Sequence, residues 1–203
     1  MKIIETNGAP NPRRVRIFMA EKGADVVYED IDLMVGALKT AEFSALNPFQ
    51  RVPVLVLDDG TILTETVAIC RYVEEIQPEP PLFGTGALER ARVEMWQRRV
   101  ELNFLLPVAQ VFRHLHPKMA HLEVPQVPDW GEANRGRALS ALTIIDDALG
   151  QSRYVAGDTF SIADITLLVA VEFMKPARIT RPAELSHLAR WYDEVRARPS
   201  AAA

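Results

Sequence analysis

A carboxylate and two hydroxyl groups stand together at the predicted start of a helix near the middle of the chain. They belong to Thr64, Glu65 and Thr66. The apolar positions that follow repeat at helical spacing and are Ala68, Ile69, Tyr72, Val73 and Ile76. Backbone N–H groups are unpaired at a helix N-terminus, and the helix dipole is positive there. The pattern therefore predicts a place that can hold a carboxylate group.

A Val-Pro step precedes this helix start and offers a second kind of contact. Pro53 begins a predicted strand over 54–57, where its missing N–H does least harm, and a turn over 58–60 leads to a returning strand over 61–64. If the Val52–Pro53 bond is cis, the backbone of Val52 faces outward like a sheet edge, and an extended peptide can pair with it. The two features together indicate a site for a peptide and its carboxylate.

The elements that must position these residues alternate between strand and helix. A short strand over 2–4 leads through a turn-rich loop into a helix that Gly23 stops. A second strand is predicted over 26–33 and a short helix over 37–45, ahead of the two strands and the helix described above. The order β-α-β-α-β-β-α matches a thioredoxin-like α/β domain.

A proline-rich break over 77–84 ends this pattern, and no strand signal follows it. Further helices are predicted over 88–112, 132–149, 161–175 and 183–198, with a loop over 117–128. Pro107 is expected to kink the first of them. Ser161 and Asp164 form a predicted capping box with a structural role. We expect a two-domain α+β chain: an α/β domain over 1–77, a linker over 78–86 and an all-helical domain over 87–203.

The VPVL strand, the DDG turn and the TETVAICRYVEE helix resemble the glutathione-binding half of the glutathione S-transferase family. In that family the Val-Pro bond is cis and the valine backbone pairs with the cysteinyl unit of glutathione. The resemblance gives this role to Val52 and Pro53, and it implies that Glu65 and Thr66 hold the γ-glutamyl end. Arg51 can reach the glycine carboxylate, although a solvated surface arginine is an equal reading. The implied fold covers essentially the whole chain.

The thiol of glutathione needs a hydrogen-bond donor or a positive field, because a free thiol with a pKa of about 8.5 is mostly protonated at neutral pH. Many family members place Tyr, Ser or Cys in the loop after the first strand, and this chain has none there. Its Ala9-Pro10-Asn11-Pro12 segment resembles the loop of the Nu-class and Ure2-like branches, where an asparagine amide lies near the sulfur. The resemblance makes Asn11 the catalytic candidate. The alternative is that Asn11 only caps the helix, with Pro12 as its first residue.

The second substrate, by the same resemblance, is expected against the long helix over 88–112. The candidates are Asn103, Phe104, Phe112 and His114, although aromatic residues at helical spacing are more often core residues. His114 and His116 lie on different helix faces, and no cysteine or paired carboxylate joins them or His121. No metal site is therefore expected. Cys70 is expected to be a small buried hydrophobe.

The composition excludes several classes of protein. The 203 residues carry a net charge of -4, with a pI near 5.6 and a mean hydropathy near zero, which gives no reason to expect nucleic acid or an anionic membrane as partner. No apolar run reaches the roughly 20 residues that span a bilayer. The single cysteine excludes an internal disulfide, and these features together suit the cytoplasm.

The resulting hypothesis is a cytoplasmic, homodimeric, glutathione S-transferase-like enzyme. It uses glutathione as cosubstrate, needs no metal, and directs the thiol to a small hydrophobic electrophile, which is a detoxification chemistry. One alternative is a glutathione-dependent disulfide reductase, as the Nu-class resemblance implies. Another is a non-catalytic glutathione-binding or stress-associated protein. The missing Tyr, Ser or Cys in the first loop keeps both alternatives open.

Overall fold

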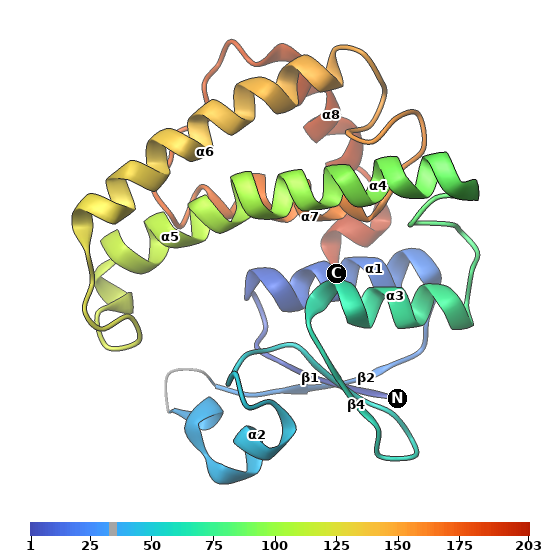
Figure 1. The fold of residues 1–203 in the computed structure, drawn as a ribbon, viewed down its shortest axis with the longest axis vertical. Helices are drawn as coiled ribbons and strands as arrows, with labels where there is room; N and C mark the ends of the chain where they lie inside the picture. The colour runs from blue at the N-terminus through green and yellow to red at the C-terminus, as the bar shows by residue number, and fades with distance from the viewer. Residues whose placement is uncertain (33–35) are drawn as a thin grey trace. The chain divides into compact units, whose positions relative to one another are not determined.

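The computed structural model of the chain describes residues 1–32 and 36–203. These residues divide into two compact units, which are drawn in Figure 1. The first unit consists of Met1–Pro81 with Pro199–Ala203, and the second consists of Leu82–Arg198. The predicted order of an α/β domain followed by an all-helical domain is confirmed. Within the described ranges, no helix is long and apolar enough to cross a membrane.

The first unit is built on a four-stranded sheet with the order β2-β1-β3-β4. Its strands are β1 (Lys2–Glu5), β2 (Val27–Asp30), β3 (Val54–Val56) and β4 (Ile62–Thr64). β1 runs parallel to β2 and antiparallel to β3, which in turn pairs antiparallel with β4. The second strand is shorter than its predicted range of 26–33, and the end of that range, at Leu33, lies outside the described residues.

Helices cover both faces of this sheet (Figure 1). α1 (Pro10–Lys22) and α3 (Thr66–Ile76) lie side by side over one face, and α2 (Ala41–Leu46) lies on the other. Side chains alternate between the two faces of a strand, so adjacent residues serve different layers. Ile4 and Val54 pack with Phe43 of α2, whereas their neighbours Ile3 and Leu55 are fully buried on the face of α1 and α3.

The predicted short helix over 37–45 is two elements in the structure. A 3-10 turn over Ala37–Lys39 is followed by α2, and Thr40 stands between them. The Thr40 hydroxyl accepts a hydrogen bond from the Phe43 N–H at 3.2 Å. This bond caps the start of α2 and separates it from the 3-10 turn.

The ends of α1 are tied to distant parts of the same unit. Lys22 is buried at the end of the helix, where it forms an ion pair with Glu74 at 2.6 Å and donates to the Pro78 carbonyl at 3.1 Å. Arg13, near the start of the helix, donates to the Ala201 carbonyl at 3.1 Å. The sequence-based boundary placed residues 199–203 with the helical domain, whereas in the structure Pro199–Ala203 group with the first unit, through contacts such as that of Arg13 with Ala201.

The second unit contains α4 (Gly86–Val100), α5 (Leu106–Leu115), α6 (Pro128–Leu149), α7 (Ile162–Phe173) and α8 (Ser186–Arg196). α7 is its central helix, because every residue from Ile162 to Val171 is buried. α6 begins four residues earlier than predicted, since proline is favourable at the first helical position. Gly131 in its first turn has a packing reason: a Cβ there would lie 2.7 Å from Leu115 Cγ.

The long helix predicted over 88–112 is interrupted by a π-helical segment, Glu101–Leu105, between α4 and α5. The Leu106 N–H bonds to the Glu101 carbonyl, one residue further back than in an α-helix. Pro107 follows directly and has no N–H to continue the ladder. The irregularity expected from Pro107 therefore takes the form of a widened turn ahead of the proline.

The predicted capping box at the start of α7 is confirmed. Asp164 Oδ2 accepts hydrogen bonds from the N–H and the hydroxyl of Ser161, both at 3.1 Å. Asp164 is fully buried. Its other oxygen accepts the Val155 N–H at 3.0 Å, so this carboxylate also fixes the loop that leads into α7.

Candidate functional site

Three connections of the first unit meet at one end of its sheet. Ile4 of β1, Val54 of β3 and Thr64 of β4 lie opposite one another in the strand register. β1 and β4 leave this row toward the starts of α1 and α3, whereas β3 is entered from the Val52–Pro53 step at the same end. The topology thus brings the segments that contain Asn11, Val52 and Glu65 to one place, although they lie far apart in the sequence.

The Val52–Pro53 bond is cis, as the resemblance implied. In the described part of the chain, neither the N–H nor the C=O of Val52 takes part in a hydrogen bond. Unpaired backbone groups beside a sheet are the groups with which an extended peptide pairs. The structure therefore provides the backbone edge that the sequence predicted.

Asn47 holds the loop before this edge, and sequence reasoning did not identify it. Its buried side chain donates from Nδ2 to the Arg51 carbonyl at 2.8 Å, and its Oδ1 accepts the Phe49 N–H at 3.0 Å. Gln50 within the loop adopts a left-handed conformation with φ 54°. The Asn-Pro dipeptide at 47–48 is a turn signal that pointed to this role.

Glu65 and Thr66 stand at the start of α3, as predicted, but the helix begins at Thr66 with Glu65 as its N-cap, and Thr64 ends β4. Glu65 has φ 67° and ψ 121°, which is a strained conformation for a residue with a side chain. Its side chain is exposed and makes no hydrogen bond or ion pair with the residues that the structure describes, whereas Thr66 is buried. The first N–H groups of α3 remain available to an anion.

Asn11 is the second residue of α1, which begins at Pro10 with Ala9 as N-cap. The alternative in which Asn11 caps the helix is therefore wrong. Pro10 and Pro12 have no N–H, so Asn11 carries the one backbone N–H among the first three helical residues. Its Oδ1 accepts from Arg14 Nη1 at 3.1 Å, which leaves the exposed side-chain NH₂ group free to donate.

The nearby hydroxyl of Thr6 is a weaker donor candidate, because it donates to the Ile31 carbonyl at 2.6 Å. Arg51 is exposed, and its guanidinium contacts the Gln50 carbonyl at 3.2 Å. The loop between β1 and α1 contains no Tyr, Ser or Cys. Asn11 remains the donor that the local structure favours.

A buried ion pair that sequence reasoning missed joins the end of β1 to α1. The Glu5 carboxylate is fully buried and accepts from Arg16 Nε at 2.7 Å. The Arg16 guanidinium lies 4.0 Å above the ring of Tyr28 on β2. Hydrogen bonding to Glu5 raises the pKa of Arg16, and burial raises the pKa of Tyr28. These contacts fix α1, which carries Asn11 in its first turn, on the sheet.

The second-substrate candidates belong to the second unit and differ in exposure. Asn103 is exposed and donates from its side chain to the Arg99 carbonyl at 3.0 Å. Phe104 has no exposed surface and is a core residue, so we leave it out of the proposed substrate wall. Phe112 is partly exposed, with its ring centroid 4.9 Å from that of His116 and 5.2 Å from that of Phe173.

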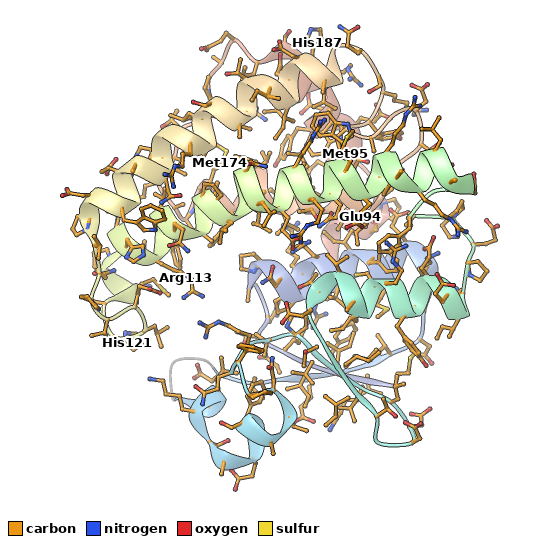
Figure 2. All side chains as sticks on the ribbon, viewed as in Figure 1. Glu94, Met95, Arg113, His121, Met174 and His187 are labelled. Carbon is orange, nitrogen blue, oxygen red and sulfur yellow. The ribbon has the colours of Figure 1, made fainter. Side chains whose placement is uncertain are left out.

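His114 links α5 to the start of α6. The Val127 N–H donates to its Nδ1 at 3.1 Å, so the ring proton is on Nε2, which lies 3.2 Å from Gln110 Oε1. His116 Nδ1 accepts the Lys118 N–H at 3.2 Å, and His121 lies in the loop before α6 (Figure 2). Among the described residues, no three His, Cys, Asp or Glu side chains are grouped as metal ligands. Cys70 is fully buried, as predicted.

Comparison with known proteins agrees with this geometry. Residues 9–76 match the glutathione S-transferase N-terminal domain, and residues 128–194 match the C-terminal domain of the same family. The chain is 38% identical to glutathione S-transferase 2 of Saccharomyces cerevisiae, over 98% of its own length and 87% of that protein's. The chain belongs to the glutathione S-transferase family.

Solved structures of family members have the same fold. A glutathione S-transferase domain-containing protein from Marinobacter aquaeolei superposes with a TM-score of 0.95 at 40% identity, with 98% of this chain and 99% of that one covered. Gtt2 from Saccharomyces cerevisiae superposes with a TM-score of 0.94 at 38% identity, with 98% of each chain covered. The thioredoxin-like and helical domains are therefore those of a glutathione S-transferase.

Proposed function

We propose that this protein binds glutathione at the end of the sheet in its first unit and directs the thiol to a hydrophobic electrophile. The observation that carries this proposal is the strand register, in which Ile4, Val54 and Thr64 lie opposite one another on neighbouring strands. It brings an unpaired backbone edge, a helix N-terminus and an amide donor to the same end of one sheet. These groups suit a short peptide that has a free carboxylate and a thiol.

The groups of the tripeptide pair with these positions by their chemistry. The Val52 backbone pairs with the cysteinyl unit as an added strand, beside Pro53. The Glu65 carboxylate attracts the α-amino group of the γ-glutamyl residue, and the Thr66 hydroxyl and the first N–H groups of α3 bind its carboxylate. Arg51 reaches the glycine carboxylate. The relatives that are named glutathione S-transferases support this assignment.

The transfer step needs the thiolate rather than the thiol. Donation from the Asn11 amide to sulfur favours the anion and lowers the pKa of the bound thiol. An amide cannot accept a proton, so the thiol proton passes to solvent. The thiolate then attacks the electrophilic carbon, a C–S bond forms, and a leaving group such as chloride departs with its electron pair. This transfer step needs no metal ion.

Asn103, Phe112 and His114 are the side chains that we propose for the electrophile wall. Asn103 is exposed, and Phe112 presents part of its ring in an aromatic group with His116 and Phe173. The His114 ring is held in place behind this group, because its Nδ1 accepts the Val127 N–H and its Nε2 lies within hydrogen-bond distance of Gln110 Oε1. A hydrophobic or aromatic electrophile suits such a surface.

A matched pair of variants tests the binding proposal. Glutathione at one hundred times its Kd should stabilise the wild-type protein by roughly 2.7 kcal/mol in thermal unfolding. Glu65→Gln should raise the glutathione Kd, whereas Glu75→Gln, an exposed carboxylate later on α3, should leave it unchanged. Equal effects of the two substitutions would contradict the assignment of Glu65.

Conjugation of a chlorodinitrobenzene by the wild-type protein tests the transfer chemistry. Reduction of hydroxyethyl disulfide without conjugation would instead support the glutathione-dependent reductase. Glutathione binding without either activity would support a non-catalytic binding protein. The engaged hydroxyl of Thr6 is the one structural feature that favours these alternatives, because it leaves the first loop without a free hydroxyl donor.

We also propose that two copies form a homodimer in the cytoplasm. Leu88, Met95 and Leu102 are exposed at successive intervals of seven residues, and Leu106 is exposed beyond them. Such spacing makes one apolar stripe along α4 and its continuation, with Met95 labelled in Figure 2. The lone buried cysteine, Cys70, supports a reducing compartment. The stripe fits a second copy of this chain.

A further inference from the structure

The side chains of Asn11 and Arg14 lie next to each other on α1. Residues three apart are neighbours on one face of a helix, and a helical side chain leans toward the preceding turn, so Arg14 reaches back to Asn11. Arg14 Nη1 donates to Asn11 Oδ1 at 3.1 Å. Arg14 is only 2% exposed, whereas Asn11 is exposed. A buried guanidinium group therefore holds one end of an exposed amide.

This hydrogen bond determines which end of the Asn11 amide is available to a ligand. A guanidinium group has donors and no acceptor, so the amide atom that faces Arg14 is the oxygen. The NH₂ group of the same amide is left for other partners. The backbone is constrained as well, because Pro10 and Pro12 flank Asn11 and each proline ring fixes its own φ. The amide therefore has one orientation before any ligand binds.

A fixed amide and a freely turning amide affect a bound thiol differently. An amide that can turn over accepts a hydrogen bond from the thiol through its oxygen and donates one to the thiolate through its NH₂ group. It stabilises both forms, and the pKa of the thiol changes little. An amide that can only donate stabilises the thiolate alone and lowers that pKa. A neighbouring guanidinium group also polarises the amide, which strengthens its N–H donors.

The other cations of α1 have partners away from the Asn11 amide. They are Arg13, which donates to the Ala201 carbonyl at 3.1 Å, Arg16, which donates to Glu5 at 2.7 Å, and Lys22, which pairs with Glu74 at 2.6 Å. Arg14 is the cation of this helix that binds the Asn11 side chain.

We propose that Arg14 is a positioning residue for the transfer reaction, because it fixes the Asn11 amide with only its NH₂ group available to the sulfur of glutathione. This inference rests on the proposed function, in which Asn11 donates to the thiolate. Arg14 acts through Asn11 and does not touch the substrate. Its removal lets the amide turn over, so the pKa of the bound thiol rises while the groups that bind glutathione stay in place.

A double-mutant cycle between the two residues tests this role. Arg14→Met keeps a long side chain without donors and should raise the pKa of the bound thiol by about half a unit or more. In an Asn11→Ala protein the same substitution should raise it by less than about 0.2 unit, because no amide remains to be fixed. Arg14→Lys keeps a donor and should restore most of the difference. Thiolate absorbance against pH with saturating glutathione measures each value.

The pH profile of conjugation separates positioning from a purely structural role. For Arg14→Met the profile should move to higher pH, with the plateau rate and the glutathione Kd within about two-fold of the wild-type values. A damaged fold would instead lower the plateau or raise the Kd without moving the profile. Arg13→Met is the matched control, because it removes the neighbouring guanidinium group, whose partner is the Ala201 carbonyl, and it should leave the profile in place.

A measurement on the unmutated protein applies even if Arg14→Met does not fold. With asparagine labelled with nitrogen-15, the side-chain NH₂ signals of Asn11 should move with pH in the glutathione complex, and their midpoint should equal the pKa of the thiol. In the complex with S-methylglutathione, which has no thiol proton, they should stay constant. Constant signals in the glutathione complex would overturn the proposal.

Other outcomes would also overturn it. An equal pKa rise for Arg14→Met with and without the Asn11 amide would mean that the charge of Arg14 acts directly on the sulfur. An equal shift for Arg13→Met would mean a diffuse effect of the helix charges. An unchanged pKa in Arg14→Met, with a lowered thiol pKa in the wild-type protein, would end this inference and leave the proposed function intact. Calorimetry without glutathione binding by the wild-type protein would end both.

Discussion

Asp164 Oδ1 accepts the indole N–H of Trp191 at 2.9 Å, and both side chains are fully buried. Trp191 lies on α8, whereas Asp164 belongs to the first turn of α7. The same carboxylate accepts hydrogen bonds from Ser161 and from the Val155 N–H. One buried side chain thereby joins the N-terminus of the central helix, the loop before it and the last long helix of the second unit.

Trp191→Phe should lower the free energy of unfolding by about 1–3 kcal/mol, because it removes a donor from a buried carboxylate and leaves a small void. Urea unfolding followed by circular dichroism measures this change. Trp130→Phe is the control: its indole also donates a hydrogen bond, to Gln110 Oε1 at 2.9 Å, but its side chain is 42% exposed. A loss of stability as large for Trp130→Phe would contradict this account.

Burial raises the pKa of Asp164 to about 6, against the opposing effect of its hydrogen-bond donors. The native state therefore holds a proton on this group at pH values where the unfolded chain, with a pKa of 3.8, does not. The contribution of this group to the free energy of unfolding is fully present below pH 4. It is lost as the pH rises through about 6, which is a change of about 3 kcal/mol.

Two measurements check this pH dependence. The stability of the wild-type protein relative to Asp164→Asn should fall between pH 4 and pH 6.5, because the amide does not titrate. A carbon NMR titration of the Asp164 carboxyl in the wild-type protein gives its pKa without a mutation. A measured pKa below 4 would show that the four hydrogen bonds lower the pKa of Asp164 more than burial raises it.

Glu65→Gly should stabilise the fold and weaken glutathione binding at the same time. Glycine adopts φ 67° without strain, so a gain of about 1 kcal/mol is expected in thermal unfolding of the free protein. Loss of the carboxylate should raise the glutathione Kd. Glu75→Gly, within α3, should instead cost about 1 kcal/mol and leave the Kd unchanged. A destabilised Glu65→Gly protein would show that the Glu65 side chain supports the fold.

Asn11→Ala should raise the pKa of the bound glutathione thiol by about one unit, which corresponds to one lost hydrogen bond. Thiolate absorbance measured against pH with saturating glutathione reports this pKa, and conjugation at neutral pH should slow accordingly. Asn7→Ala, in the loop just before α1, removes an exposed side chain and should change neither quantity. Unchanged thiol pKa and turnover for Asn11→Ala would remove Asn11 from the mechanism.

Met95→Glu should shift the protein from dimer to monomer in light scattering, because it places a charge in the middle of the apolar stripe on α4. Ile144→Glu is the matched control, since Ile144 on α6 is 63% exposed and lies outside this stripe. A monomeric wild-type protein, or equal effects of both substitutions, would contradict the homodimer proposal.

Local patterns predicted most of the elements, and the exceptions have local physical reasons. Apolar periodicity identified α3 and α7, and the Ser161 and Asp164 box marked the start of α7. The pattern did not show the π-helical turn before Pro107, because a proline inside a helical pattern signals an irregularity but not the form that it takes. It also did not show that Thr40 divides the segment over 37–45, since a threonine is tolerated inside a helix.

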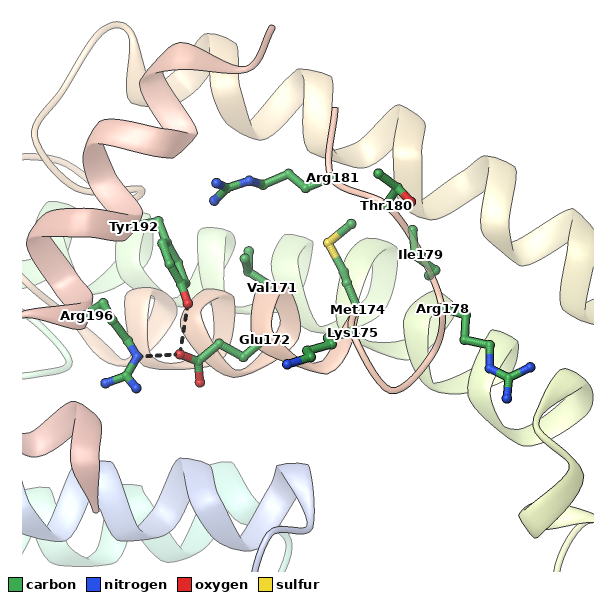
Figure 3. Close-up of a pocket in the computed structure, with 10 residues that line it drawn as sticks. All are labelled: Val171, Glu172, Met174, Lys175, Arg178, Ile179, Thr180, Arg181, Tyr192 and Arg196. Carbon is green, nitrogen blue, oxygen red and sulfur yellow. Dashed lines mark hydrogen bonds and ion pairs between the residues drawn. The ribbon is translucent and has the colours of Figure 1, made fainter. Parts of the chain in front are cut away.

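The sequence by itself predicted which groups could bind a peptide: the Val52–Pro53 step, Glu65 with Thr66, and Asn11 in a segment without Tyr, Ser or Cys. Strand register, which is set by pairing between distant segments, decided that these groups meet at one end of the sheet. The tertiary structure also decided that Phe104 is core, and it gathered Lys175, Arg181 and Tyr192 around one hollow of the second unit (Figure 3). Such groupings depend on contacts between residues far apart in the chain, which local spacing does not encode.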